Sequence, residues 1–169
     1  MPQHEIETHI REFLTEDRLQ NALAFSAHLQ ENKMQLERGR GYWADKLYWC
    51  VKYQNEYVCF ILIGGEEAVR EDEWILWSDD SDSRWYENAP LDAATRDLAW
   101  AHVDFCGSCG GSCAPGTDKI LFGKAFQGIC RTTFRFDNPD AQALDCAKKL
   151  TELRKNDICK EIANEEGTV

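Results

Sequence analysis

The chain lacks a long apolar run. Its longest strongly apolar stretch is VCFILI, residues 58–63, whereas a helix that crosses a bilayer needs about 20 such residues. The first residues, MPQHEIETHIREF, are polar and acidic, without the charged-then-apolar order of a secretory signal. We therefore expect no membrane partner and a cytoplasmic location.

Positive charge is also scarce. The sequence has 19 Lys and Arg residues against 30 Asp and Glu residues, a formal net charge of -11 at pH 7. Such a chain repels a phosphate backbone unless a local basic patch overcomes the general field. We expect no nucleic-acid binding by this chain alone, and the acidic surface serves either solubility or the docking of a basic protein partner.

Motifs that carry catalysis are missing as well. The four histidines are isolated from one another and form no H-E-x-x-H pair, and no glycine-rich phosphate loop follows a predicted strand. The acidic stretch DDSDS, residues 79–83, lacks the glycine and the terminal glutamate of a calcium loop. The sequence leaves enzymatic activity open and favours a non-enzymatic role.

What the chain does have is enough apolar material for one core. Its 169 residues are 43% hydrophobic and 11% aromatic, which is typical of a globular domain. No internal repeat, low-complexity tract or linker divides the sequence. We therefore expect a single domain over residues 1–169.

Hydrophobic periodicity predicts alternating helices and strands. The predicted helices cover residues 4–14, 15–32 and 92–105, and a last helix begins at Asn138–Pro139; the predicted strands cover residues 47–53, 56–63, 73–77 and 129–136, with a short extended segment at 84–86. Because neighbouring strands are close in sequence and crossovers are few, the fold class is α+β. We expect an antiparallel sheet with a central hairpin packed against helices from both termini.

The central hairpin is predicted to turn at Gln54–Asn55. Pairing Tyr53 with Glu56 places Trp49 opposite Phe60 and Val51 opposite Val58. That register gathers the apolar side chains on one face, as a half-buried sheet requires. It also sets Cys50 opposite Cys59 on the other face.

The stretch CGSCGGSCAPG, residues 106–116, concentrates three of the eight cysteines. Cys106 and Cys109 form a C-x-x-C pair, Cys113 follows four residues later, and Cys130 begins a predicted strand. Tetrahedral zinc takes four such soft ligands, and the glycines allow the backbone to wrap an ion. We predict a zinc site at these four cysteines, structural in character because four thiolates leave no open position for water.

Other uses of the cysteines are open. An iron–sulfur cluster is the less favoured cofactor, because its usual cysteine spacings do not match this one. Redox chemistry is disfavoured by the position of Cys106 after a predicted helix, where the negative dipole end raises a thiol pKa. The remaining possibilities are a disulfide and reduced thiols without a ligand.

Two further groups of side chains are candidate binding residues. Five tryptophans on or beside the predicted sheet either fill the core or line an aromatic pocket for a planar ligand: Trp43, Trp49, Trp74, Trp77 and Trp85. Four basic residues fall in a stretch without acids and form a candidate anion patch: Lys119, Lys124, Arg131 and Arg135. This stretch either faces acidic segments of the same chain or receives an anionic ligand.

The stretch CGSCGGSCAPGTDKILFGKAFQGIC, followed by FRFDNPDAQALDCAKKL, resembles a group of uncharacterised bacterial proteins. The shared elements are the C-x-P-G loop at Cys113–Gly116, an FGK-x-F…C segment from Phe122 to Cys130, and an NPD helix start at Asn138–Asp140. The resemblance covers most of residues 34–158. Similar domains follow AraC-type helix-turn-helix segments in some proteins, which implies ligand sensing and a bacterial source but transfers no established activity.

Together these patterns favour a cytosolic binding or sensing domain with a zinc site and an aromatic pocket for a small molecule. The alternatives are a metal- or thiol-dependent redox enzyme and an acidic protein-interaction module.

Overall fold

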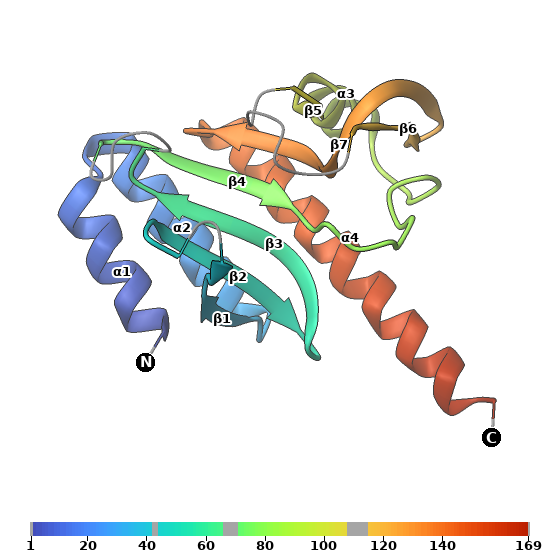
Figure 1. Ribbon diagram of the computed structural model, residues 1–169, viewed down its shortest axis with the longest axis horizontal. Helices are drawn as coiled ribbons and strands as arrows, with labels where there is room; N and C mark the ends of the chain where they lie inside the picture. The colour runs from blue at the N-terminus through green and yellow to red at the C-terminus, as the bar shows by residue number, and fades with distance from the viewer. Residues whose placement is uncertain (1, 42–43, 66–70, 108–114, 169) are drawn as a thin grey trace.

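The computed structural model describes residues 2–41, 44–65, 71–107 and 115–168 of the chain (Figure 1). Its helices and strands are, in order, α1 (Pro2–Phe13), α2 (Glu16–Glu31), β1 (Gln35–Arg38), β2 (Leu47–Tyr53), β3 (Glu56–Ile63), β4 (Trp74–Ser78), α3 (Ala93–Ala101), β5 (Val103–Phe105), β6 (Thr117–Leu121), β7 (Lys124–Asp137) and α4 (Ala141–Glu166). The predicted α+β class is confirmed.

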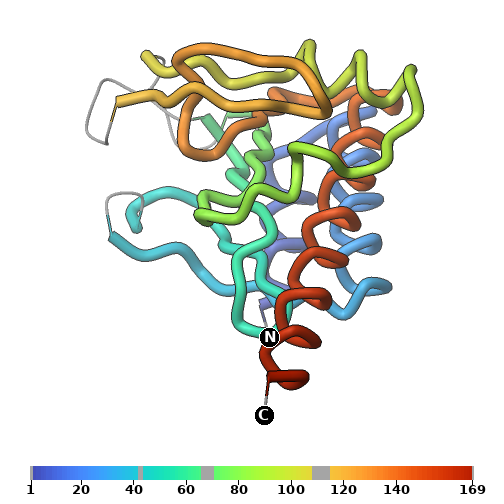
Figure 2. The backbone as a smooth tube through the Cα atoms, turned by 90° about the vertical axis from the view of Figure 1, so that its right-hand side faces the viewer, coloured from blue at the N-terminus to red at the C-terminus, as the bar shows by residue number. Residues whose placement is uncertain are grey.

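The described strands form one seven-stranded antiparallel sheet. Its order is β1-β2-β3-β4-β7-β5, with β6 pairing to β7 outside this path. The β2–β3 hairpin lies inside the sheet, and α1, α2 and α4 gather on one side of it (Figures 1 and 2). We call the side that these helices cover the core face, and the opposite side the outer face.

Side chains on the core face fill the main hydrophobic core. The helices contribute apolar stripes at helical spacing, and the strands contribute every second residue. Fully buried members include Ile6, Ile10, Phe25, Leu29, Trp49, Ile61, Trp74, Phe134 and Ile158. The outer face has a smaller buried cluster of its own: Phe60, Leu62, Ile75 and Trp77, with Tyr48 and Cys50 packed against it.

The hairpin turns where expected, but its predicted register is wrong beyond the first pairs. Gln54 and Asn55 both have positive φ, 53° and 68°, as a type I′ turn requires. A β-bulge at Val58 then shifts the pairing, so Trp49 lies opposite Ile61 and Cys50 opposite Phe60. The shift by one residue moves Phe60 to the outer face, and Cys50 and Cys59 end on opposite faces of the sheet.

Three short strands were not predicted from the sequence. The strands β1, β5 and β6 have four, three and five residues, and they lack the dense apolar and aromatic residues that marked β4 in the sequence. The helix α3 ends at Ala101 rather than at residue 105, because Val103 and Phe105 pair with β7 instead. Residues 84–86 form a turn and not the expected extended segment.

The strand β7 belongs to two parts of the sheet. Residues between Lys124 and Phe134 pair with β5 and β6, and residues 135–137 pair with β4. Just before this change of partner, Thr133 has a φ of 70°, a conformation that is unusual for a β-branched residue. The Ser78 hydroxyl bridges the irregularity, since it donates to the Thr132 carbonyl and accepts from the Phe134 N–H.

The turn at Gln54–Asn55 yields a testable prediction. Combining Gln54→Asn with Asn55→Gly supplies the Asn-Gly pair that a type I′ turn prefers, so the double substitution should raise the free energy of unfolding by about 0.5–1 kcal/mol. Urea denaturation measures the change. Asn164→Gly in the exposed end of α4 is the matched control and should destabilise slightly. Destabilisation by the turn substitution would contradict the turn conformation.

Candidate functional site

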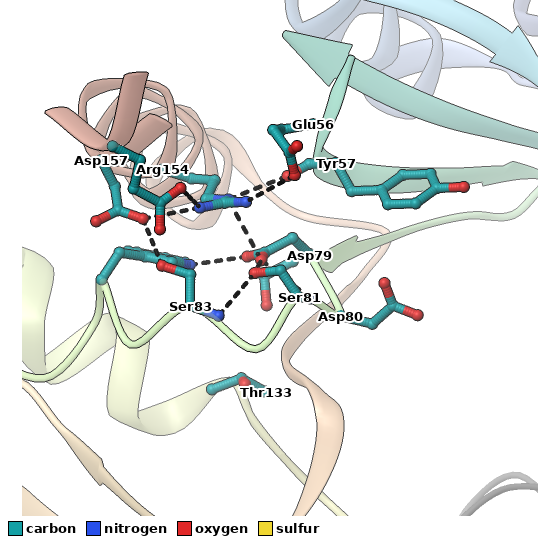
Figure 3. A network of polar contacts seen from close by, with 12 residues as sticks. Glu56, Tyr57, Asp79, Asp80, Ser81, Ser83, Thr133, Arg154 and Asp157 are labelled. Carbon is teal, nitrogen blue, oxygen red and sulfur yellow. Dashed lines mark hydrogen bonds and ion pairs between the residues drawn. The ribbon is translucent and has the colours of Figure 1, made fainter. Parts of the chain in front are cut away.

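A buried arginine holds together the end of β4, the start of β3 and the helix α4. Arg154 is 1% exposed. Its Nε donates to the Tyr57 carbonyl at 3.0 Å and lies 3.4 Å from Asp79 Oδ2, and its Nη1 donates to Asp157 Oδ2 at 2.7 Å. Figure 3 shows these groups converging on the guanidinium from three elements. Because a buried charge must be paired and hydrogen-bonded, this network fixes the three elements relative to one another.

Asp79 is the buried counter-charge of this network. It is 4% exposed and accepts a hydrogen bond from Trp85 Nε1 at 2.8 Å. The Ser81 hydroxyl and backbone N–H also donate to it (Figure 3). Burial raises the pKa of Asp79, and the hydrogen bonds from Ser81 and the charge of Arg154 oppose that rise.

The loop that follows Asp79 contributes residues to the walls of two cavities. Asp80 lines the larger one, and Ser81 and Asp82 line the smaller one. The Asp80 carbonyl accepts a hydrogen bond from Arg131 Nε at 3.0 Å. The network around Arg154 therefore positions a loop that contributes to both cavities.

The larger cavity, which we call the outer-face groove, has a volume of about 760 Å³. Aromatic rings form part of its wall: Tyr48 stacks on Phe60 with centroids 5.9 Å apart, and Tyr57 lies 5.5 Å from Phe60. Tyr57 is 38% exposed. Ligand sites commonly combine such apolar walls with a few polar groups.

Gly39 allows the Tyr48 ring to lie against β1. A Cβ at position 39 would stand 1.9 Å from Tyr48 Cδ1, so any side chain there would displace the ring. The Gly39 N–H donates to the Tyr48 carbonyl and continues the strand pairing. The wall of the groove thus depends on the absence of a side chain at position 39.

Three titratable groups of the groove, Tyr48, Cys50 and Lys52, keep their ordinary protonation states near neutral pH. Burial raises the pKa of Tyr48, with the nearby Cys50 and Asp80 acting in the same direction, and burial also raises the pKa of the Cys50 thiol. The hydrogen bond from Lys52 to Glu37, at 2.7 Å, raises the pKa of Lys52. The groove therefore offers a neutral phenol, a neutral thiol and a fixed ammonium group.

The smaller cavity, which we call the β6–β7 cavity, has a volume of about 350 Å³. Its wall includes the Tyr86 ring, Lys119, Ile129 and Arg131. Lys119 Nζ donates to the carbonyls of residues 130 and 131 and, at 2.6 Å, to Thr133 Oγ1.

Of the five tryptophans predicted to line a pocket, the structure describes four, and it does not bring these four together around one cavity. Trp49 and Trp74 are 0% and 1% exposed in the main core, and Trp85 packs there beside Phe134. Trp77 lies on the outer face. Trp43 lies outside the described residues. Three of the four rings are therefore buried in the main core and the fourth in the outer-face cluster, and the aromatic wall of the groove consists of tyrosine and phenylalanine.

The predicted anion patch is divided by the fold. Lys119 and Arg131 line the β6–β7 cavity. Lys124 lies over the rings of Trp100 and Phe126, and Arg135 lies over the Trp77 ring and pairs with Asp137 at 2.9 Å. The four basic residues share a strand or its neighbour but do not meet at one place.

The cysteine prediction falls partly outside the described residues, because Cys109 and Cys113 lie there. Cys106 is exposed and Cys130 is half-buried. The Cys106 N–H donates to the Gly128 carbonyl at 2.8 Å, two residues from Cys130. No three potential ligands among the described His, Cys, Asp and Glu residues gather around a common point.

The helix-dipole argument against redox chemistry does not apply. Cys106 follows the strand β5 and not the end of a helix, so a negative helix terminus does not act on it. The remaining cysteines lie apart from this loop: Cys50 in the groove, Cys59 and Cys146 buried, and Cys159 exposed.

Sequence reasoning missed Arg154 and Asp79. One signal was present: Arg154 continues the stripe of Ala143, Ala147 and Leu150 at spacings of three and four residues. A cation on a buried stripe points to a buried carboxylate partner. The partner lies 75 residues away in sequence, and periodicity carries no information about it.

Comparisons with known proteins give no match: no family model, no curated protein and no solved structure is similar to the chain. None of the helices in the described ranges has the length and apolar character needed to cross a bilayer.

Removing the buried guanidinium should be costly. Arg154→Met leaves the Asp79 carboxylate buried without its counter-charge, so the free energy of unfolding should fall by about 3–5 kcal/mol. Adding Asp79→Asn should recover part of this loss, since the amide still accepts from Trp85. Lys149→Met, which breaks an exposed ion pair on the same helix, should cost less than about 1 kcal/mol. Urea unfolding measures all three.

The loss of stability in Arg154→Met should depend on pH. A carboxyl whose folded pKa is raised loses stability as pH increases from its unfolded pKa through its folded pKa. Without Arg154 this rise is larger, so the deficit of Arg154→Met should shrink between about pH 7 and about pH 4.5. A deficit that is constant over this range, or no recovery in the double variant, would contradict the role given to Asp79.

Proposed function

We propose that this protein is a non-enzymatic binding or sensing domain that takes a small planar molecule into the outer-face groove. The observation that carries the proposal is the stack of Tyr48 and Phe60, extended by the exposed Tyr57, inside a cavity of about 760 Å³. Offset aromatic stacking and apolar burial would supply the affinity for a flat ring system. Polar groups at the rim would orient it.

The protonation states in the groove support binding rather than acid–base catalysis. A general base or acid works best when its pKa lies near the operating pH. The pKa of Cys50 and that of Tyr48 are both raised away from neutrality, and Lys52 is held as an ammonium by Glu37. These groups are suited to hydrogen bonding and to cation–π contact with a ligand.

A titration with Nile red, a neutral planar dye whose fluorescence rises in apolar surroundings, tests the proposal. Tyr57→Ala should weaken binding about three- to tenfold, because one stacking partner is lost. Cys50→Phe should weaken it further by filling the groove. Phe105→Ala removes an aromatic ring that is 55% exposed elsewhere and serves as the matched control. Equal losses in all three variants, or none in the first two, would refute the groove as the site.

A second candidate function is a structural zinc site at Cys106, Cys109, Cys113 and Cys130. One contact supports it: a Cβ at Gly116 would stand 2.5 Å from Cys106 Cβ and 2.7 Å from the Gly128 carbonyl. The two sides of the cysteine-rich stretch therefore lie against each other and against the strand that carries Cys130. Free thiols at both described positions are the ligand type that zinc prefers.

Elemental analysis of untagged protein tests the zinc site. One zinc per chain is expected, and Cys106→Ser or Cys130→Ser should lower both the zinc content and the melting temperature. Cys159→Ser, an exposed cysteine far along α4, is the control and should change neither. Visible absorbance with bound iron would favour the iron–sulfur alternative, and a metal-free protein with unaltered melting in the variants would reject both.

A further inference from the structure

Two cations in the β6–β7 cavity bond to neutral oxygens in a protein where acids outnumber bases. Lys119 Nζ is satisfied by two backbone carbonyls and the Thr133 hydroxyl, and Arg131 Nε by the Asp80 carbonyl. Within the described part of the chain, no carboxylate lies within ion-pair distance of either group. With 30 acidic residues available, two neighbouring cations without a carboxylate partner are unexpected.

The position of Lys119 is fixed by an unusual piece of backbone. Thr133, which receives its shortest hydrogen bond, is 1% exposed and has a φ of 70°. Strained backbone of this kind costs free energy and is concentrated at functional sites. Here it places a hydroxyl and two carbonyls around the ammonium group, and the Tyr86 ring lies 5.4 Å from Nζ. The charge is therefore held in the cavity wall before any ligand arrives.

Burial makes this charge costly in the absence of a ligand. Desolvation lowers the pKa of Lys119, the charge of Asp79 raises it, and the charge of Arg131 lowers it. Asp79 is itself engaged by Trp85, Ser81 and Arg154. An anion between Lys119 and Arg131 would relieve both the repulsion and the desolvation.

The carboxylates in the wall of the same cavity do not pair with Lys119 or Arg131 among the described residues. Glu87 is paired with Arg84 at 2.6 Å, and Asp118 accepts the Gly128 N–H at 3.2 Å. Asp82 and Asp118 are exposed. Repulsion from the exposed carboxylates is therefore weakened by water. The anion has to fit between Lys119 and Arg131 in a cavity of about 350 Å³, which favours a compact one.

We propose that the β6–β7 cavity binds the compact oxyanion group, carboxylate or phosphate, of a small molecule between Lys119 and Arg131. Among the described residues, the recorded hydrogen bond of Arg131 uses Nε, which leaves its two terminal nitrogens for a bidentate contact, and Lys119 contributes a fixed positive charge. The site is separate from the outer-face groove, so it does not rest on the binding of a planar molecule there.

NMR titration of ¹⁵N-labelled protein with inorganic phosphate and with acetate tests the site, with sodium chloride at matched ionic strength as reference. Saturable shifts should appear at the amides of residues 81–87 and 129–133. Arg131→Gln should weaken binding at least fivefold, whereas Lys124→Gln and Arg135→Gln, on the same strand, should change it less than twofold.

The pattern of responses identifies the type of anion and can overturn the proposal. A response to phosphate alone identifies a phosphoryl group, and a response to both anions identifies any compact oxyanion. The proposal is overturned if chloride reproduces the shifts, or if all three variants weaken binding equally. Tyr57→Ala should leave the phosphate response intact, which separates this site from the groove.

Discussion

The ion pair between Arg154 and Asp79 is the interaction on which the outer surface depends. It lies where the last helix crosses the end of β4 and the start of β3, and it is almost fully buried. Two buried charges are tolerated only with nearly complete hydrogen bonding, which the Tyr57 carbonyl, Trp85, Ser81 and Asp157 provide. The network therefore fixes the start of the loop that begins at Asp79 and lines both cavities.

The two faces of the sheet use their aromatic residues differently. On the core face, three indole rings and several phenyl rings fill space in the main core; on the outer face, Tyr48, Tyr57 and Phe60 lie beside a groove. The bulge at Val58 produces this division, since it moves Phe60 out of the core and brings Cys59 into it. A single extra residue in one strand thus determines which side chains are available to a ligand.

Much of the fold could be predicted from the sequence, because it rests on local patterns. The helices at both ends, the hairpin turn at Gln54–Asn55 and the Asp92 cap all follow from periodicity and backbone chemistry within a few residues. The bulge at Val58 and the short strands β5 and β6 depend on their partners, which local patterns do not contain. The candidate site was predicted least well. The number of tryptophans does not show which of them face the core, and the role of Arg154 depends on its contact with Asp79, which is distant in sequence.

The sheet begins with the four-residue strand β1, which carries Glu37 and Arg38. An unpaired strand edge is a template for another chain, and shortness and charge are the usual protections against it. Since Glu37 and Gly39 also line the groove, the groove opens beside this edge. The protein can present an aromatic recess to small molecules there while discouraging the strand-by-strand association that leads to aggregates.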